Sequence, residues 1–163
     1  MTNVLIAIDD DRTSGPVIDF VCNHKWSDQT RFRLLCVCPW MPPESQVRTS
    51  KDLQHFIEET LKGRKLLLKD SAERIQKELG ISAVEIEEVL LQGQASELIL
   101  ELVESWPAEL LILGSHGRKG VDLFMMGSIS AAMVSHAPCS VIVVRPGKTN
   151  SLKSAEMAKS TRA

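Results

Sequence analysis

The sequence predicts an α/β fold in which an open parallel sheet is covered by helices. Five short apolar runs, each the length of a buried strand, alternate along the chain with four stretches of helical periodicity. Such alternation is typical of consecutive β-α-β units, whose crossovers are right-handed and whose strands are parallel. With 163 residues, 44% of them hydrophobic and 25% charged, the chain has the length and composition of one globular domain.

The predicted strands share a continuous apolar character, which is typical of parallel strands buried on both faces. The first run, VLIAI, is followed directly by three aspartates, residues 9–11. Acidic residues at the carboxyl end of such a strand lie where ligands bind in α/β sheets. The apolar runs and their flanking turn residues place the strands at residues 4–8, 32–38, 83–91, 110–113 and 141–144.

Apolar residues at helical spacing predict the first two helices. Thr13 or Ser14 can cap the first, with Pro16 tolerated in its first turn. The second is much longer, covers residues 51–79, and can be ended by Gly80. Its apolar stripe comprises Leu53, Phe56, Ile57, Leu61, Leu68, Ala72, Ile75 and Leu79.

The other two predicted helices are shorter. Residues 95–105 carry an inward stripe and end before Pro107. The last helix opens at Gly127-Ser128, where Ser128 suits the N-cap or the first turn, and Pro138 ends it. One side of this helix is expected to be lined by Ile129, Ala132, Met133 and His136.

Composition and charge exclude several classes of protein. The net charge of −2, with no dense basic run, argues against a dedicated nucleic-acid binder. No apolar run approaches the roughly 18 residues that a membrane span requires, and the first residues lack the features of a secretory signal. The cysteines form no CxxC pair and no zinc spacing, so we expect a reduced, cytoplasmic protein with no membrane contact.

A glycine-rich segment connects the fourth predicted strand to the last helix. Gly114, Gly117 and Gly120 follow the strand, and Gly127-Ser128 opens the helix. Glycines allow backbone N–H groups to approach an oxyanion, and a helix N-terminus adds unpaired donors and a partial positive charge. The spacing is neither that of a P-loop nor GxGxxG. From the residues alone, the segment is either a phosphate cradle or a surface turn.

This spacing resembles the ATP-binding signature of the universal stress protein family, G-x2-G-x9-G-[ST]. The motif falls on Gly114, Gly117, Gly127 and Ser128, and the flanking LLILGSHGRKG and HAPCSVIVVRP are also similar to that family. The resemblance covers residues 4–145. It implies a Rossmann-like, doubly wound five-stranded parallel sheet of order 3-2-1-4-5, with helices on both faces and ATP across the carboxyl ends of strands 1, 2 and 4.

The resemblance also implies which residues bind ATP. Asp9 matches the acidic residue beside the nucleoside, and Val37 matches the residue whose main chain recognises adenine. The rest of the implied site approaches the nucleoside or ribose or holds the phosphates. The full implied set is Ala7, Asp9, Val37, Leu113, Gly114, Gly117, Gly127, Ser128, Ile129 and Ser130.

Two positions depart from the family pattern. The family often continues the first strand with Asp-Gly-Ser, where this chain has Asp9-Asp10-Asp11. The extra carboxylates would repel a triphosphate unless they face solvent or help to hold a divalent cation. We therefore include Mg²⁺ bound together with ATP in the hypothesis. Cys36 stands at a position that often carries histidine.

We therefore expect an ATP-binding stress-response protein that acts as a nucleotide-dependent regulator or interaction module. One alternative is a slow, metal-assisted ATPase or phosphotransferase, for which Asp9, His116, Arg118 and Lys119 are the candidate groups. Another is a dimeric interaction module that no longer binds nucleotide. The linear pattern contains no evident Ser-His-Asp set or Cys-His pair, so we assign no catalytic residue and favour a protein without rapid turnover.

The last predicted strand is an edge in the order 3-2-1-4-5. Its apolar side chains invite pairing with a second copy, and the family resemblance also implies a homodimer through this strand. The alternative is that the C-terminal tail covers the edge. We expect residues 1–146 to form the nucleotide-binding domain and residues 147–163 to form a flexible tail. The pairing strand comprises Val141, Ile142, Val143 and Val144.

Overall fold

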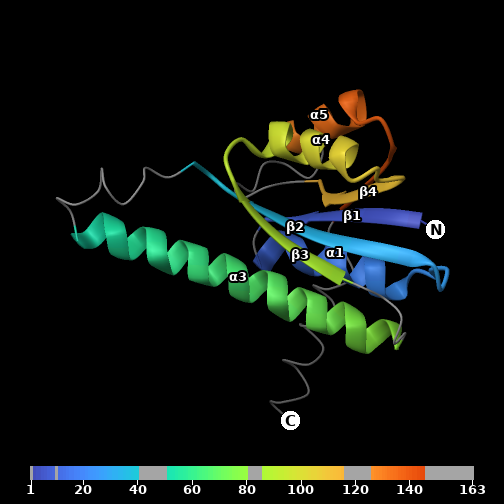
Figure 1. The fold of residues 1–163 in the computed structure, drawn as a ribbon, viewed down its shortest axis with the longest axis horizontal. Coiled ribbons are helices and arrows are strands. Elements are labelled where there is room, and N and C mark those ends of the chain that lie inside the picture. Colours follow the sequence, from blue (N-terminus) through green and yellow to red (C-terminus); the bar gives the residue numbers. More distant parts are fainter. Residues whose placement is uncertain (1, 10, 41–50, 81–85, 116–125, 146–163) are drawn as a thin grey trace, which may run out of the picture.

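A computed structural model of the chain describes residues 2–9, 11–40, 51–80, 86–115 and 126–145. Strands and helices alternate through these residues, as the sequence pattern predicts (Figure 1). In chain order they are β1 (Thr2–Ile8), α1 (Asp11–Asn23), β2 (Thr30–Cys38), α3 (Lys51–Leu79), β3 (Ile86–Gln92), α4 (Ala95–Ser105), β4 (Leu110–Gly114), α5 (Ser128–His136) and β5 (Ser140–Val144).

The five strands form one parallel sheet of order β3-β2-β1-β4-β5, which confirms the predicted fold class and strand order. β1 lies at the centre, where Ala7 is in register with Leu35 on one side and with Leu113 on the other. β2 continues past the end of β1, because Ile8 is opposite Cys36 and two further residues of β2 follow. The carboxyl ends of β1, β2 and β4 therefore lie at one edge of the sheet.

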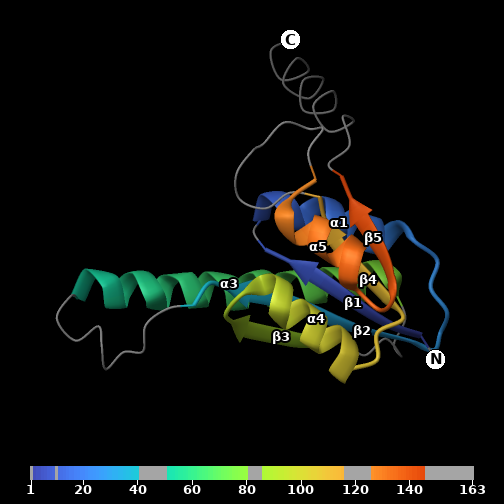
Figure 2. The same ribbon diagram turned by 90° about the horizontal axis from the view of Figure 1, so that it is seen from above.

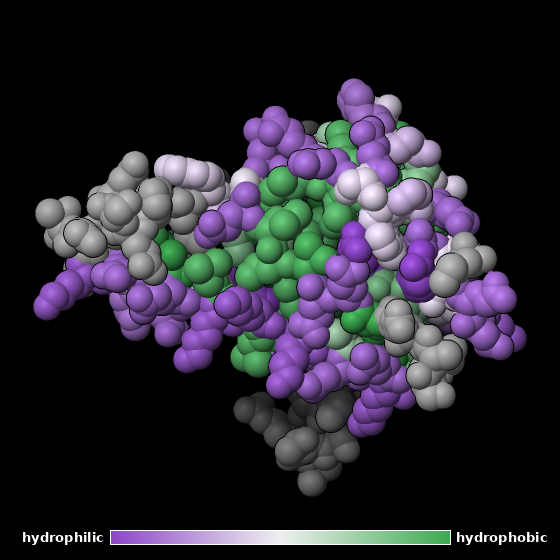
Figure 3. Space-filling view, in the orientation of Figure 1, coloured by the Kyte–Doolittle hydropathy of each residue, from purple (hydrophilic) through white to green (hydrophobic). Residues whose placement is uncertain are grey.

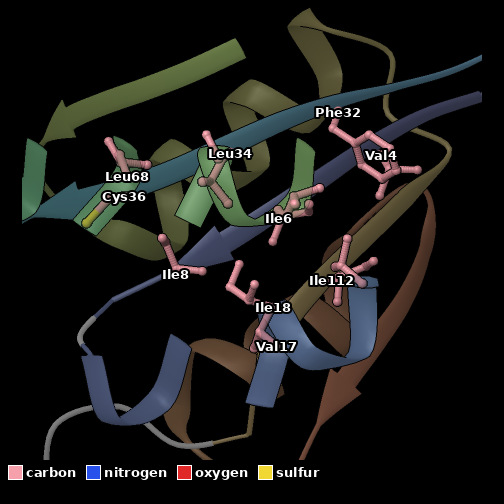
Figure 4. Packing of buried hydrophobic residues seen from close by; sticks show 13 residues of the cluster. Val4, Ile6, Ile8, Val17, Ile18, Phe32, Leu34, Cys36, Leu68 and Ile112 are labelled. Atoms are coloured by element: carbon pink, nitrogen blue, oxygen red, sulfur yellow. The ribbon is translucent and has the colours of Figure 1, made fainter. Parts of the chain in front are cut away.

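Among the described residues, α1 and α3 cover one face of the sheet and α4 and α5 cover the other (Figure 2). Alternate residues of β1 point to opposite faces, so Val4, Ile6 and Ile8 pack with α1 and α3 while Leu5 packs with α4 and α5. This division explains why the strands are apolar throughout. Figure 4 shows the first of these two cores, in which β1, β2 and β4 meet α1 and α3.

α3 is longer than the sheet that it covers. Its 29 residues span about 44 Å, whereas the nine residues of β2 span about 30 Å. Leu68, Ala72 and Ile75 are buried against the sheet, but the first turns of α3 extend beyond it (Figure 2). The prediction that Phe56 faces the core is therefore wrong, since 64% of its surface is exposed.

Smaller corrections concern the helix starts and the face of α5. α1 begins at Asp11, so Thr13 and Ser14 lie inside its first turn and not at its N-cap. α5 buries Ser130 and Met133 but leaves Ile129 37% exposed, so Ile129 does not share the buried side of the helix with Met133 as the predicted stripe implied. Residues 83–85 of the predicted third strand and the predicted tail, residues 147–163, lie outside the described residues.

Polar and charged side chains cover most of the outer face of α3, and apolar side chains gather between β3 and α4 (Figure 3). In the part of the chain that the structure describes, no helix has the length and apolar character needed to cross a membrane.

Candidate functional site

The order in which successive strands join the sheet reverses at its centre, because β2 and β3 lie on one side of β1 while β4 and β5 lie on the other. α1 follows β1 on one face, and α5 follows the neighbouring β4 on the other. In doubly wound sheets, ligands bind outside the carboxyl ends of the strands at such a switch point. The carboxyl ends of β1 and β4 are therefore where a ligand is expected.

The structure places most of the predicted site residues at this edge. Ala7 and Leu113 are register partners, Asp9 follows β1 directly, and Gly114 ends β4. Val37 is the penultimate residue of β2. The predicted residues at the start of α5 are joined to the same edge through the end of β4. Gly117, Asp10 and the candidate groups His116, Arg118 and Lys119 lie outside the described residues.

Hydrogen bonds fasten the start of α5 to the end of β4. The Gly127 N–H donates to the Ser115 carbonyl oxygen at 2.7 Å, and the Ser115 N–H donates to the Val144 carbonyl at 2.8 Å. The buried Ser130 hydroxyl lies 3.2 Å from the Ser115 carbonyl oxygen and 2.9 Å from that of Gly127. Its single proton is therefore directed at the backbone, which makes Ser130 Oγ a structural group and leaves its backbone N–H as the group available to an anion.

The first turn of α5 presents backbone donors at the switch point. The first intrahelical bond runs from the Ala131 N–H to the Gly127 carbonyl at 2.9 Å. The N–H groups of Ser128, Ile129 and Ser130 precede that bond and have no acceptor within the helix. Together with the partial positive charge of the helix N-terminus, these donors can bind an oxyanion such as a phosphate.

An arginine that the sequence analysis missed contacts Asp9. Arg64 extends from α3, and its Nη1 lies 3.0 Å from Asp9 Oδ1. The same nitrogen lies 3.7 Å from Cys36 Sγ, whose thiol lies 3.9 Å from the Asp9 carbonyl oxygen. A signal was available, because Arg64 falls on the apolar stripe between Leu61 and Leu68, where a charged residue needs an ionic partner.

Burial shapes the electrostatics of this cluster. Burial alone would lower the pKa of the Arg64 guanidinium, but its hydrogen bond to Cys36 and the charge of Asp9 contribute to raising that pKa overall. Burial disfavours the charged thiolate form and so raises the pKa of the Cys36 and Cys38 thiols, although the positive charge of Arg64 acts in the opposite direction. Arg64 is therefore a permanent cation, while both cysteines are protonated at neutral pH and are poor nucleophiles.

The described residues offer binding groups and little catalytic machinery. Across residues 2–9, 11–40, 51–80, 86–115 and 126–145, no three or more His, Cys, Asp and Glu side chains are grouped so that they could hold a metal ion. The Asp9 carboxylate, which follows β1 at the switch point, is already paired with Arg64. The backbone N–H groups at the start of α5 are suited to holding the anionic part of a ligand, and the Asp9 carboxylate can accept hydrogen bonds from donors such as hydroxyl groups.

Solved structures share this architecture. A universal stress protein in complex with cAMP has a TM-score of 0.61 at 17% identity, over 90% of this chain and 98% of that one. The Archaeoglobus fulgidus universal stress protein in complex with dAMP has a TM-score of 0.61 at 18% sequence identity, and the match covers 88% of this chain and 98% of that one. A universal stress protein family member from Arabidopsis thaliana with AMP bound has a TM-score of 0.56 at 18% sequence identity, and the match covers 91% of this chain and 94% of that one. At these identities the likeness shows a common fold.

Sequence comparison is more specific. The chain is 39% identical over 83 residues to universal stress protein A homolog 2 of Coxiella burnetii, covering 49% of this chain and 55% of that protein. It is 36% identical over 92 residues to a Thermus aquaticus universal stress protein, and the match covers 55% of this chain and 64% of that protein. The matches thus span between about half and two thirds of these relatives. The family model for universal stress proteins matches residues 1–145, and the chain therefore belongs to the universal stress protein family.

Proposed function

We propose that this protein binds an adenine nucleotide, with ATP as its ligand, at the carboxyl edge of the sheet between β1 and β4. The observation that carries the proposal is the row of three backbone N–H groups at Ser128, Ile129 and Ser130, fixed beside the end of β4 by the Gly127–Ser115 hydrogen bond. The related structures with cAMP, AMP and dAMP support an adenine nucleotide.

The residues present fit such a ligand. The N–H groups at the start of α5 would hold phosphate oxygens, Asp9 would lie beside the ribose, and the main chain of Val37 would face the adenine. Gly127 has φ −61° and ψ 154°, an extended conformation that any residue adopts, so the local backbone does not itself require glycine there. Close approach of a phosphate to this position provides a reason for the missing side chain.

The proposed role is that of a nucleotide-dependent regulator in the stress response, which presents a ligand-dependent surface to other proteins. Turnover of ATP is expected to be slow, because the Asp9 Oδ1 that pairs with Arg64 is not available to act as a base or as a ligand of Mg²⁺. We also propose a cytoplasmic location, which agrees with four cysteines that are free in the structure.

Backbone amide NMR tests the position of the site. Adding ATP to nucleotide-free protein is expected to shift the amide signals of Leu113, Gly114 and residues 128–130, because the ligand contacts or neighbours these groups. The amides of Thr30 and Ser140, at the amino ends of β2 and β5, serve as internal controls, and their signals are expected not to shift. Shifts confined to the amino ends of the strands would contradict the proposed site.

We further propose a homodimer through β5. In the described part of the chain this strand pairs with β4 on one side and lies at the edge of the sheet. Four consecutive side chains, Val141 to Val144, are apolar and half-buried, and such an edge favours pairing with a second copy.

A charge on the edge strand tests this assembly. Val143→Lys should convert dimers to monomers in sedimentation velocity, because it places a positive charge on the pairing strand of both copies. Leu66→Lys adds the same charge at an exposed apolar position of α3 and should leave the dimer intact. A monomeric parent protein, or a dimer that tolerates Val143→Lys as well as Leu66→Lys, would contradict the assignment of β5.

A further inference from the structure

We propose that Arg64 is a positioning residue of the nucleotide site, which fixes the Asp9 carboxylate where it accepts a hydrogen bond from the ribose. This inference rests on the proposed nucleotide-binding function and adds the residue that sets ribose recognition. Arg64 acts through Asp9 and does not itself contact the nucleotide.

The first argument is geometric. The Arg64 guanidinium holds the Asp9 side chain through Oδ1 at 3.0 Å, and the Cys36 thiol contacts the Asp9 backbone carbonyl at 3.9 Å. Three elements, β1, β2 and α3, therefore converge on one residue at the switch point. Cys36 and Leu68 lie together beside Ile8 in this part of the core (Figure 4). Asp9 is held at both its side chain and its backbone.

The second argument concerns burial. Only 9% of the Arg64 side chain is exposed, whereas 37% of the Asp9 side chain remains accessible at the strand end. A buried guanidinium is retained only when its charge is compensated, and here the compensating group is a carboxylate that still reaches solvent. The same helix makes a second Arg–Asp pair, Arg74 with Asp19, in which both side chains are about half exposed. The Arg64–Asp9 pair thus differs from the Arg74–Asp19 pair, because its arginine is buried while its carboxylate is accessible to solvent.

The third argument is chemical. An ionised carboxylate only accepts hydrogen bonds, and ribose hydroxyls are donors that match it. Fixing the carboxylate before the ligand arrives avoids the entropic cost of ordering it on binding. A site built to bond a hydroxyl rejects the analogue that lacks it. Arg64 should therefore control discrimination between ribose and deoxyribose more than it controls phosphate binding.

The experiment compares the affinities of ATP, 2′-deoxyATP and 3′-deoxyATP by calorimetry. The parent should prefer ATP over at least one deoxy analogue by about tenfold or more. Arg64→Met should reduce that preference to about twofold, because Asp9 is no longer held, and Arg64→Lys should retain part of it. Arg74→Met, which breaks the exposed pair on the same helix, should behave as the parent does.

A double-mutant cycle shows whether Arg64 works through Asp9. In an Asp9→Asn background, Arg64→Met should change the discrimination no further. Asp9→Asn alone leaves the buried guanidinium uncompensated, whereas the double variant leaves neither charge unpaired, so the double variant and Arg64→Lys give the comparison with the parent where a single variant folds poorly. Equal discrimination in the parent and the Arg64 variants, or an effect of Arg64→Met that persists in Asp9→Asn, overturns the inference while leaving nucleotide binding established. A parent that binds no ATP overturns both.

Discussion

Phe32→Ala is expected to lower the free energy of unfolding by about 3–5 kcal/mol. Phe32 is 1% exposed and is among the largest fully buried side chains of the described residues. Near the start of β2 it lies opposite Val4 of β1 and Ile86 of β3, and its ring meets Trp26 edge-on with centroids 5.2 Å apart. Truncation would remove both apolar burial and an aromatic pair at the junction of three strands.

Phe56→Ala is the matched control. It deletes the same atoms from the exposed start of α3, and alanine is the better helix former, so the free energy of unfolding should change by less than about 1 kcal/mol. Urea unfolding of both variants measures the difference. If the two substitutions cost the same, the placement of the core against α1 and the sheet is incorrect.

Gly127→Val should weaken ATP binding by about 100-fold or more, because its branched side chain would project beside the N–H groups that hold the phosphates. The extended backbone of Gly127 accepts valine without strain, so the fold should survive. Loss of glycine at the N-cap should cost about 1 kcal/mol of stability. Calorimetric titration with ATP measures the affinity, and urea unfolding measures the stability.

Gly63→Val provides the control for this substitution. A Cβ at Gly63 would meet no atom within 4 Å, and the residue lies on the exposed part of α3. This variant should bind ATP as the parent does. An equal loss of affinity in both variants would mean that the effect of Gly127→Val is not local to the phosphate site.

The sequence pattern predicts the secondary structure well because most elements are buried on a regular period. The apolar runs mark the strands to within about two residues, except where β3 meets residues outside the described set. The order of the strands came from the family resemblance, since runs of similar composition do not say which strands are neighbours. Phe56 was misplaced because periodicity identifies the apolar face of a helix and not the length of sheet available to cover it.

The site was predictable in part for the same reasons. Gly114, Gly117, Gly127 and Ser128 fall in one contiguous spacing, so a linear motif identifies them, whereas Asp9 was assigned from the family resemblance at the end of the first apolar run. The contact of Arg64 with Asp9 joins residues that are distant in sequence, and only the packing of α3 on the sheet creates it. The burial of Ser130 was also hidden, because a serine is buried only when partners such as the Ser115 carbonyl satisfy its hydroxyl.

Thermal unfolding of protein freed of bound nucleotide, measured after ATP is added with and without Mg²⁺, shows whether this protein binds ATP. At about 100 times its dissociation constant, ATP should add roughly 2.7 kcal/mol of stability, which corresponds to a rise in Tm of about 5–10 °C for a chain of this size. The rise should be absent in Gly127→Val and present in Gly63→Val. If ATP does not raise Tm in the parent protein, or raises it equally in Gly127→Val, the nucleotide site proposed between β1 and β4 is wrong.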